Sequence, residues 1–255
     1  MQLDFILQHL DTAYRLACKK KQRRSEKDDI WNVRFFWPAV KAKIITELNN
    51  SEYVFSPVRV IEYKSGKYLH SFTSQDYIVL KALSLSLFQN LPRCAFCHSW
   101  KGHGGINKAI NRVRRSTPSF YYKTDVQNYY ASIAHHKVFE QLSPYIQDDR
   151  VFRLIYCALK NQGGEIGLPR GSPLSHLLGN FYLHELDAKF THRPSQTYVR
   201  YMDDIMLLSE HKGALRRGIK TINHDLNQLG LTNVFHKSMI SHTNKTQTRF
   251  LGAIV

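Results

Sequence analysis

Three acidic residues stand in stretches of sequence that are otherwise apolar. Asp203 and Asp204 separate two short apolar arms, and Asp125 follows an aromatic run that has the composition of a strand. An Asp-Asp pair by itself is common in turns. Carboxylates half-buried between apolar strands are costly, however, unless a cation compensates them, and hard divalent cations prefer carboxylate oxygens. The pattern therefore predicts that the three side chains converge on metal.

A cluster of this kind suits phosphoryl transfer. Two Mg²⁺ ions about 3.5–4 Å apart stabilise both the attacking and the leaving oxygen of that reaction. One ion would lower the pKa of a primer 3′-hydroxyl, and the other would hold a triphosphate and neutralise the departing pyrophosphate. We therefore predict Asp125, Asp203 and Asp204 as catalytic residues and metal ligands, with Val126 as a further ligand and Mn²⁺ as a substitute ion.

The elements that must position these carboxylates are two neighbouring strands of one sheet. Periodicity predicts helices at residues 74–91, 106–115, 135–145, 148–161, 172–190 and 214–229, and two more within residues 1–50, joined by the basic run at 19–24. Strands are predicted in hairpins at residues 51–72 and 198–209, and at 120–126, 234–241 and 249–255. Helices that alternate with antiparallel hairpins indicate an α+β fold.

The charge of the chain points to a polyanionic partner. Its 36 Lys and Arg against 20 Asp and Glu leave a net charge of +16. Self-repulsion of this size is relieved by a polyanion, of which nucleic acid is the commonest, with an anionic membrane as the rival. No apolar run is long enough to span a bilayer, and 4 cysteines are too few for a disulfide framework. These features favour a reducing, cytoplasmic setting.

Several segments, in order along the chain, resemble the motifs of reverse transcriptases. They are residues 120–133 around Asp125 for the first palm motif, residues 167–183 for the second, Tyr201-Met202-Asp203-Asp204 for the third, and Phe250-Leu251-Gly252 for the start of the primer-grip hairpin. Lys237 lies where the intervening motif carries a lysine. The set is far more specific than the Asp-Asp pair alone.

The resemblance is closest to the bacterial enzymes of group II introns, retrons, diversity-generating elements and phage defence. Residues 180–187, residues 66–76 and the loop at 103–105 support this likeness. It implies right-hand polymerase fingers and palm with an antiparallel palm sheet. The corresponding division is an N-terminal helical basic extension at 1–50, fingers at 51–119 and palm at 120–255.

The resemblance also implies roles for individual residues. Tyr130, five residues past Asp125, takes the position that packs under the incoming sugar, where a bulky ring excludes a 2′-hydroxyl and favours dNTPs. Glycine at position 171 would let the backbone approach the base pair. The implied nucleotide-binding residues are Tyr130, Arg170, Gly171, Lys67, Lys64 and Lys237, and the primer and template residues are Tyr201, Met202, Pro169, Phe250, Leu251 and Gly252.

Three classes of function stay open. The first and favoured one is an RNA-directed DNA polymerase that uses an RNA template, a DNA or RNA primer and dNTPs. The second is an untemplated or protein-primed DNA polymerase of a defence system, and the third is a non-catalytic nucleic-acid binder with a polymerase fold. Tyr130 argues only against an RNA product, so it does not separate the first two classes. The three intact aspartates argue against the third class, a polymerase fold that has lost its activity.

Family members usually continue past the primer-grip hairpin into a helical thumb, whereas this sequence stops just after Gly252. The thumb is thus expected to be absent from this chain. We expect either a fragment or a clamp completed by structured non-coding RNA or a partner protein.

Weaker signals carry less specific expectations. Cys94, Cys97, His98 and His103 have the residue types of a zinc knuckle, but adjacent ligands in one loop fit tetrahedral zinc poorly, so ordinary thiols are favoured. The aromatic residues Trp31, Phe35, Phe36 and Trp37 are expected to form a small core under the N-terminal helices, with base stacking as the alternative. His135 and His136 are expected at the surface.

Overall fold

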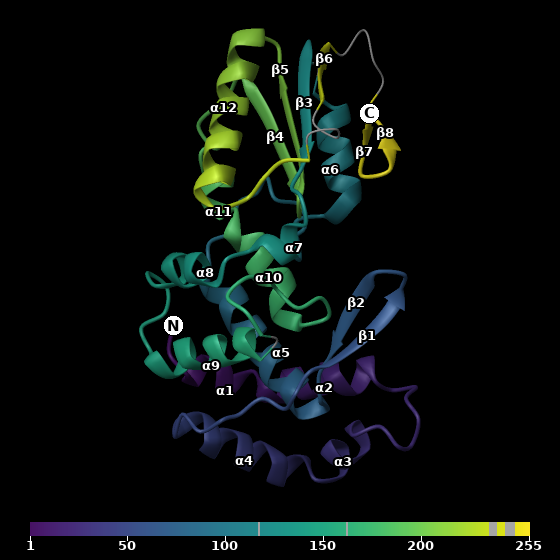
Figure 1. Cartoon of the computed structure of the whole chain (residues 1–255), viewed down its shortest axis with the longest axis vertical. Coiled ribbons are helices and arrows are strands. Elements are labelled where there is room, and N and C mark those ends of the chain that lie inside the picture. The colour runs from purple at the N-terminus through teal and green to yellow at the C-terminus, as the bar shows by residue number, and fades with distance from the viewer. Residues whose placement is uncertain (117, 162, 235–238, 243–247) are drawn as a thin grey trace. The chain divides into compact units, whose positions relative to one another are not determined.

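The computed structural model describes residues 1–116, 118–161, 163–234, 239–242 and 248–255. Each of its two compact units is built from two separate segments of the chain. The helical unit comprises Met1–Leu91 with His135–Leu178, and the sheet unit comprises Pro92–Ala134 with Gly179–Val255 (Figure 1). The sequence-based division at residues 50 and 119 stays a prediction.

The helical unit is organised around one buried helix. Its elements are α1 (Asp4–Gln8), α2 (Leu10–Lys20), α3 (Ile30–Phe35), α4 (Trp37–Asn49), β1 (Arg59–Lys64), β2 (Lys67–Ser71), α5 (Ser74–Asn90), α8 (His135–Leu142), α9 (Asp149–Lys160) and the start of α10 (Pro173–Tyr182). The predicted helix at 74–91 is confirmed as α5, and the Thr73 hydroxyl caps it by accepting from the Asp76 N–H at 3.2 Å. Helices α1, α2 and α3 all pack against α5.

One lysine of the basic run at 19–24 has a structural role. The Lys21 ammonium lies 3.0 Å from an Asp28 oxygen and 2.8 Å from Asp29, and it also bonds to the Ser74 hydroxyl. Asp29 in turn accepts from the Ser74 N–H and hydroxyl at the start of α5. Lys21 therefore joins the turn before α3 to the beginning of α5.

The predicted hairpin at 51–72 is confirmed as the antiparallel pair β1–β2. Its register places Val60 opposite His70 and Ile61 opposite Leu69. Every residue of β1 is exposed, including Val60 and Ile61, so this hairpin extends away from the core of its own unit.

The sheet unit holds a four-stranded antiparallel sheet in the order β4-β5-β3-β6. Its elements are α6 (Gly105–Arg114), β3 (Phe120–Asp125), α7 (Tyr129–Ser132), the end of α10, α11 (His184–Ala188), β4 (Gln196–Tyr201), β5 (Asp204–Ser209), α12 (Lys212–Gln228), β6 (Met239–His242), β7 (Arg249–Phe250) and β8 (Ala253–Ile254). The sheet stands between α12 and α6 (Figure 1).

Alternate residues of the strands pack against the two covering helices. On the α6 side, Ala109 and Val113 join Tyr121, Val199, Met206, Leu208 and Phe250 in one buried cluster. On the α12 side, Gly218 lies so close to Leu207 and Gln196 that a side chain at this position would overlap them. The sheet therefore has both faces covered, which leaves the strand ends as the place for a site.

Several local expectations were wrong in detail. The first 50 residues form four helices and not two. Between α3 and α4, Phe36 leaves the helical region at φ −110° and Pro38 favours a fresh helix start. The expected helix at 172–190 is divided into α10 and α11. Trp31, Phe35 and Phe36 lie outside any core, with Phe35 82% exposed. His135 is buried, and its Nε2 bonds to the Gly167 carbonyl oxygen at 2.7 Å.

In the residues that the structure describes, no helix is both long and apolar enough to cross a membrane.

Candidate active site

The three predicted aspartates meet at one end of the sheet. Asp125 is the last residue of β3, and Asp204 is the first residue of β5 and its direct partner across the antiparallel pair. Asp203 precedes Asp204 in the turn from β4, and its carbonyl oxygen accepts from the Val126 N–H at 3.3 Å. The hairpin expected around the Asp-Asp pair is therefore confirmed, and β5 lies beside the strand that carries Asp125.

Asp203 is partly buried beside two further carboxylates. Burial, followed by the negative charges of Asp125 and Asp204 and a hydrogen bond with Asp125, raises the pKa of Asp203 from 3.8 to about 6. Carboxylates that repel one another in this way are stabilised by a cation placed among them. The local field therefore favours binding of a positive ion.

The donor chemistry of the three aspartates fits a hard divalent cation. Among the described residues, however, no three side chains of Asp, Glu, His or Cys already form a compact ligand group. The aspartates are thus neighbours with the right oxygens, and a bound cation would draw their side chains together.

The turn that carries Asp203 has an unusual backbone. Met202 has φ +54°, in the left-handed region that a residue with a side chain adopts only at a cost of about 1–3 kcal/mol. Both of its backbone groups are held: the N–H donates to the Ser99 hydroxyl at 3.1 Å, and the carbonyl oxygen accepts from Arg200 Nη1 at 2.9 Å. These bonds fix the turn in the conformation that presents Asp203.

Arg200 is the centre of a buried polar network behind this turn. Its side chain is 0% exposed and forms an ion pair with Asp187 of α11, with Nη2 and Oδ2 2.6 Å apart and Nε and Oδ1 2.7 Å apart. Nη2 also donates to the Asn180 carbonyl oxygen, and the Tyr198 hydroxyl donates to Asp187. The whole guanidinium is therefore engaged, and its position is set by α10 and α11.

A second branch of the network reaches the turn through Ser99. The Asn180 side-chain oxygen accepts from the Ser99 hydroxyl at 2.5 Å, and the Cys97 thiol lies 3.2 Å from the same hydroxyl. Ser99 was not singled out from the sequence, and Cys97 and Asn180 were not predicted to position this turn. The available signal was Arg200 itself, because a charge inside the apolar arm at 198–202 must be paired if the strand is buried.

Tyr130 lies beside the same turn. It follows Asn128, whose φ of +47° bends the chain sharply after β3, and it belongs to the short helix α7. A side chain at Gly179 would come within 3.5 Å of the Tyr130 ring and 3.6 Å of the Met202 methyl group. Both side chains therefore converge on Gly179, which brings Tyr130 close to the turn that carries Asp203.

The loop at 169–171 belongs to the helical unit. The His70 N–H of β2 donates to the Arg170 carbonyl oxygen at 2.7 Å, whereas the Arg170 side chain is exposed. Pro169 is buried, and its carbonyl oxygen accepts from the Ser175 hydroxyl. Gly171 has φ +107°, and a Cβ there would lie 2.6 Å from the His70 carbonyl oxygen. The glycine thus permits a close approach between this loop and the hairpin.

Changing Gly171 to alanine is expected to destabilise the helical unit by about 1–3 kcal/mol, because alanine is strained at this φ and its Cβ meets backbone that cannot rotate away. Urea denaturation of the variant against the wild type measures the loss. Gly163→Ala is the matched control, since Gly163 also has positive φ but has open space around it. Equal losses in both variants would show that backbone strain alone, and not the contact with β2, sets the effect.

The remaining predicted residues lie at separate places in the fold. In the helical unit, Lys64 ends β1 and is exposed, and it pairs through the backbone with Lys67 of β2. In the sheet unit, Leu251 (φ +50°) and Gly252 (φ +84°) form the turn between β7 and β8, and Phe250 is buried in the core. Tyr201 is partly buried at the end of β4. Lys237 lies outside the described residues.

The cysteine-histidine segment supports the loop that borders β4. Cys97 is buried, and the His98 N–H donates to the Arg200 carbonyl oxygen, so this segment continues the sheet edge. His98 Nδ1 bonds to the His103 carbonyl oxygen, and His103 Nδ1 bonds to the Cys97 carbonyl oxygen. Both imidazoles therefore hold backbone in place, and Cys94 is a partly exposed thiol.

A family model described as reverse transcriptase (RNA-dependent DNA polymerase) matches residues 66–255, a range that begins within the β1–β2 turn and includes Tyr130 and all three aspartates. The chain belongs to the reverse transcriptase family. Its mixed helices and antiparallel sheets are the fingers and palm of that fold. Reverse transcriptases generally use divalent metal ions.

Two curated relatives place the chain among reverse transcriptases of bacterial type. The group II intron-encoded protein LtrA of Lactococcus lactis is 27% identical over 205 residues, which cover 73% of this chain and 34% of LtrA. The retron Ec73 reverse transcriptase of Escherichia coli is 25% identical over 161 residues, which cover 57% of this chain and 50% of that enzyme. The chain thus spans half or less of the length of these relatives.

Among solved structures, apo telomerase from Candida tropicalis, truncated from its C-terminal domain, resembles this reverse transcriptase chain with a TM-score of 0.56. The likeness covers 86% of this chain and 58% of the telomerase chain at 13% identity, and it therefore concerns the fold alone.

Proposed function

We propose that this chain is an RNA-directed DNA polymerase that transfers nucleotides from dNTPs to a primer 3′-hydroxyl by a two-metal mechanism. The observation that carries the proposal is the meeting of Asp125, Asp203 and Asp204 at the ends of two paired strands. Burial, and then the charges of Asp125 and Asp204, raise the pKa of Asp203, a cost that has a purpose in an enzyme that binds divalent ions. A binder of nucleic acid would gain nothing from clustering anions beside phosphate.

In this mechanism the chain's own residues hold the metal ions and orient the catalytic carboxylates and the primer. Asp125, Asp203 and Asp204 would hold the divalent ions, Mg²⁺ or Mn²⁺, which lower the pKa of the primer hydroxyl and neutralise the leaving pyrophosphate. Met202, fixed by its two backbone hydrogen bonds, keeps Asp203 in place without rearrangement during the reaction. Leu251 and Gly252 in the β7–β8 turn are the residues proposed to contact the primer.

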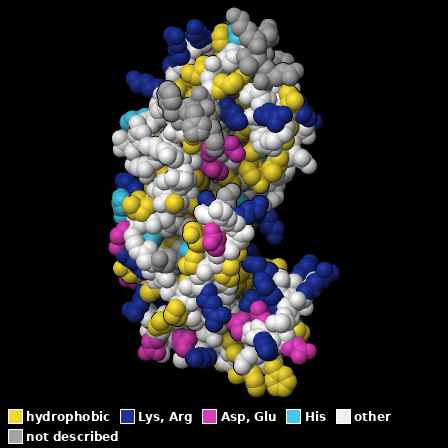
Figure 2. Space-filling model, turned by 45° about the vertical axis from the view of Figure 1, so that its right-hand side comes forward, with side chains coloured by type: hydrophobic (Ala, Val, Ile, Leu, Met, Phe, Trp, Pro, Cys, Tyr) yellow, Lys and Arg dark blue, Asp and Glu magenta, His cyan; other side chains and the backbone are white. Residues whose placement is uncertain are grey.

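The surface charge supports a nucleic-acid substrate. Figure 2 shows Lys and Arg side chains over much of the visible face, with fewer Asp and Glu among them. In the helical unit, the lining of a cavity of about 630 Å³ includes Arg23, Arg24, Lys27 and Arg59, beside the ion pairs of Lys21 with Asp28 and Asp29. We propose that the RNA template and the DNA or RNA primer are held in part by these cations, and that structured RNA or a partner protein can complete the clamp.

Tyr130 is proposed as the residue that excludes ribonucleotides. Changing Tyr130 to alanine is expected to raise the efficiency of NTP incorporation relative to dNTP incorporation by about 10-fold or more, because a 2′-hydroxyl then fits the vacated space. Single-nucleotide incorporation on an RNA template with dNTP or NTP measures the ratio. The control Tyr130→Phe keeps the ring and should keep the wild-type preference. An unchanged ratio in the alanine variant would remove Tyr130 from this role.

Primer extension on an RNA template tests the proposed function. We expect extension with dNTPs and Mg²⁺, none with EDTA, and none in the Asp203→Asn variant. Extension without a template, or from a protein hydroxyl without a primer, would favour the untemplated or protein-primed alternative. If no nucleotide is incorporated under any of these conditions, even with native flanking RNA added, the remaining explanation is a non-catalytic nucleic-acid binder. The proposed setting is a bacterial cytoplasm, which suits the four free thiols.

A further inference from the structure

A second polar cavity lies in the sheet unit, beside α6 and away from the aspartates. It has a volume of about 640 Å³, and its lining includes His98, Lys108, Arg112, Arg115 and Thr197. None of Asp125, Asp203 and Asp204 lines it, and Thr197 lies roughly 13 Å along β4 from Tyr201 at the catalytic turn. It therefore takes no part in holding the divalent ions.

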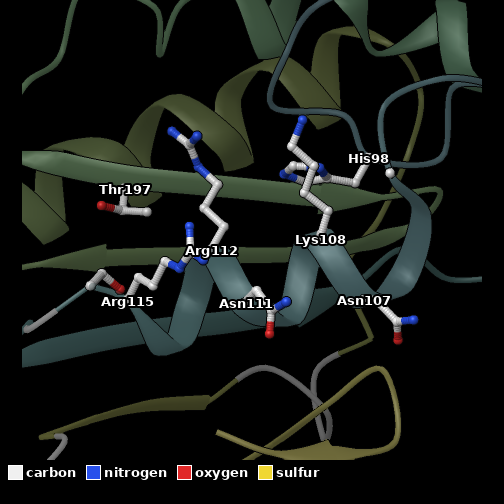
Figure 3. Close-up of a pocket in the computed structure, with 9 residues that line it drawn as sticks. His98, Asn107, Lys108, Asn111, Arg112, Arg115 and Thr197 are labelled. Carbon is white, nitrogen blue, oxygen red and sulfur yellow. The ribbon is translucent and has the colours of Figure 1, made fainter.

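The cations of this cavity form a row. Lys108, Arg112 and Arg115 recur at helical spacing on α6 and at its end, so their starting points are about 6 and 4.5 Å apart along the axis. In Figure 3 the Lys108 and Arg112 side chains rise from α6 on the side of the strand that carries Thr197, with the His98 ring beside Lys108. A row of positive charges suits a row of phosphates better than it suits a single small anion.

Among the described residues that line the cavity, the positive charges have no acidic neighbour. In the part of the chain that the structure describes, none of Lys108, Arg112 and Arg115 forms an ion pair, and no Asp or Glu lines the cavity. Arg112 stacks on the Phe96 ring at 4.7 Å, and its Nε is buried without a hydrogen-bond acceptor among the described residues. A buried guanidinium N–H without an acceptor is costly, and an incoming oxyanion would satisfy it.

His98 adds an independent sign of a ligand. Its side chain lines the cavity, the residue is only 1% exposed, and among the described residues nothing bonds to its Nε2. Burial lowers the pKa of His98, and the positive charges of Arg112 and Lys108 lower it further. The bond to the His103 carbonyl oxygen opposes this shift. A negative charge in the cavity would reverse that effect of the two cations.

The shape of the backbone also fits a built site. Gly104, at φ +87°, precedes α6, and a Cβ there would come within 2.5 Å of Lys108 Cδ. The absence of a side chain at this position leaves room for Lys108 to lie over the cavity. A role limited to the helix dipole does not account for Lys108, because a cation is favourable near the last turn of a helix and Lys108 lies in the first.

We propose that this cavity binds the phosphodiester backbone of a nucleic-acid strand, as a contact separate from the polymerase centre. Lys108, Arg112 and Arg115 take successive phosphates, and the contact is independent of base sequence because it is made to phosphate. The inference extends the proposed polymerase function but does not require catalysis, so it is tested with inactive protein.

The test measures binding in the Asp203→Asn background, without nucleotides. A labelled single-stranded RNA of roughly 20 nucleotides is titrated by fluorescence anisotropy from about 50 to about 300 mM salt. The site variant is Lys108→Gln with Arg115→Gln, because both side chains are exposed and their removal spares the core. The matched control is Arg216→Gln with Arg217→Gln, which removes the same charge from the exposed face of α12 in the same unit.

We expect the site variant to lose RNA affinity on the order of tenfold, and the slope of log K against log salt to fall by about 1.4, the value for two phosphate contacts on a single strand. The control should stay close to wild type. Wild-type affinity and slope in the site variant, or an equal loss in the control, would overturn the proposal. Thermal melting followed by circular dichroism checks the fold, and Lys108→Arg with Arg115→Lys should restore binding.

Two further arms identify the source of the phosphate. A DNA strand of the same sequence should show the same loss in the site variant, because both strands carry the same backbone charge. Inorganic phosphate, titrated at constant ionic strength, should displace RNA only weakly. Displacement by low concentrations of inorganic phosphate would identify a free-phosphate site and contradict strand binding. A failure of primer extension would affect none of these outcomes.

Discussion

Changing Asp203 to asparagine is expected to abolish nucleotide incorporation and, at the same time, to stabilise the metal-free protein. Activity should fall on the order of 10³-fold or more, because a ligand is lost where charge develops during the reaction. Stability should rise because Asp203 is the carboxylate whose pKa is raised to about 6 by burial and then by its neighbours Asp125 and Asp204. Both effects follow from a carboxylate that is partly buried beside two others, where a cation can bind.

The pH dependence gives the sign of the stability effect. An acid with a higher pKa in the folded than in the unfolded chain costs stability as it ionises, between about pH 4 and pH 6 for Asp203. Above that window the wild type should be less stable than the asparagine variant by about 1–2 kcal/mol, a value reduced for partial exposure. Urea denaturation in EDTA at pH 4 and pH 8 measures the difference. Glu210→Gln, which removes an exposed carboxylate of the same unit, is the control.

Magnesium should reverse the order of stability. Binding to the folded state alone raises the melting temperature of the wild type, and the asparagine variant should gain less because it has lost a ligand. If the variant were no more stable than the wild type at pH 8 in EDTA, the repulsion among Asp125, Asp203 and Asp204 would be too weak to matter.

The second large effect is expected at the buried ion pair. Changing Asp187 to alanine should destabilise the protein by about 3–5 kcal/mol, because Arg200 would be left as a fully buried charge without its carboxylate. The Tyr198 hydroxyl would lose its acceptor as well. Urea denaturation measures the loss, and Asp149→Ala, at an exposed position in α9, is the control.

A double variant separates stability from positioning. Asp187→Leu with Arg200→Met should recover much of the lost stability, because a buried pair can be replaced by apolar residues of similar volume. It should not recover incorporation, because the Met202 carbonyl oxygen would still lack its donor in the strained turn. Single-turnover incorporation at saturating dNTP measures this. A fully active double variant would show that Arg200 serves the fold and not the turn.

The parts of the fold that could be predicted are those that local sequence patterns determine. The hairpin around Asp203 and Asp204, helix α5 with its Thr73 cap, and the hairpin β1–β2 all depend on residues close in sequence. The convergence of Asp125 on the Asp-Asp pair could be predicted as well, because paired strands with carboxylates at their ends leave little choice of register.

The rest depends on contacts that no local pattern reveals. Arg200 meets Asp187 only because the strand and α11 pack together, and Ser99 reaches the Met202 N–H from more than a hundred residues away. The burial of His135 requires the Gly167 carbonyl oxygen, which lies 32 residues further along the chain. In the sequence, the cations of α6 have the spacing of an ordinary solvated helix face. They lie near His98 only because the loop that carries His98 folds back along β4.

The interleaving of the two units has a consequence for synthesis on the ribosome. The helical unit cannot be complete until residue 178 has emerged, although about two thirds of its chain is available by residue 91. The segment 92–134 must wait meanwhile for partners that begin at residue 179. In a chain made from its N-terminus, β3 with Asp125 therefore exists well before the strand that pairs with it. Neither unit can be transplanted by a single junction, and a recombinant exchange of either one requires two segments to be moved together.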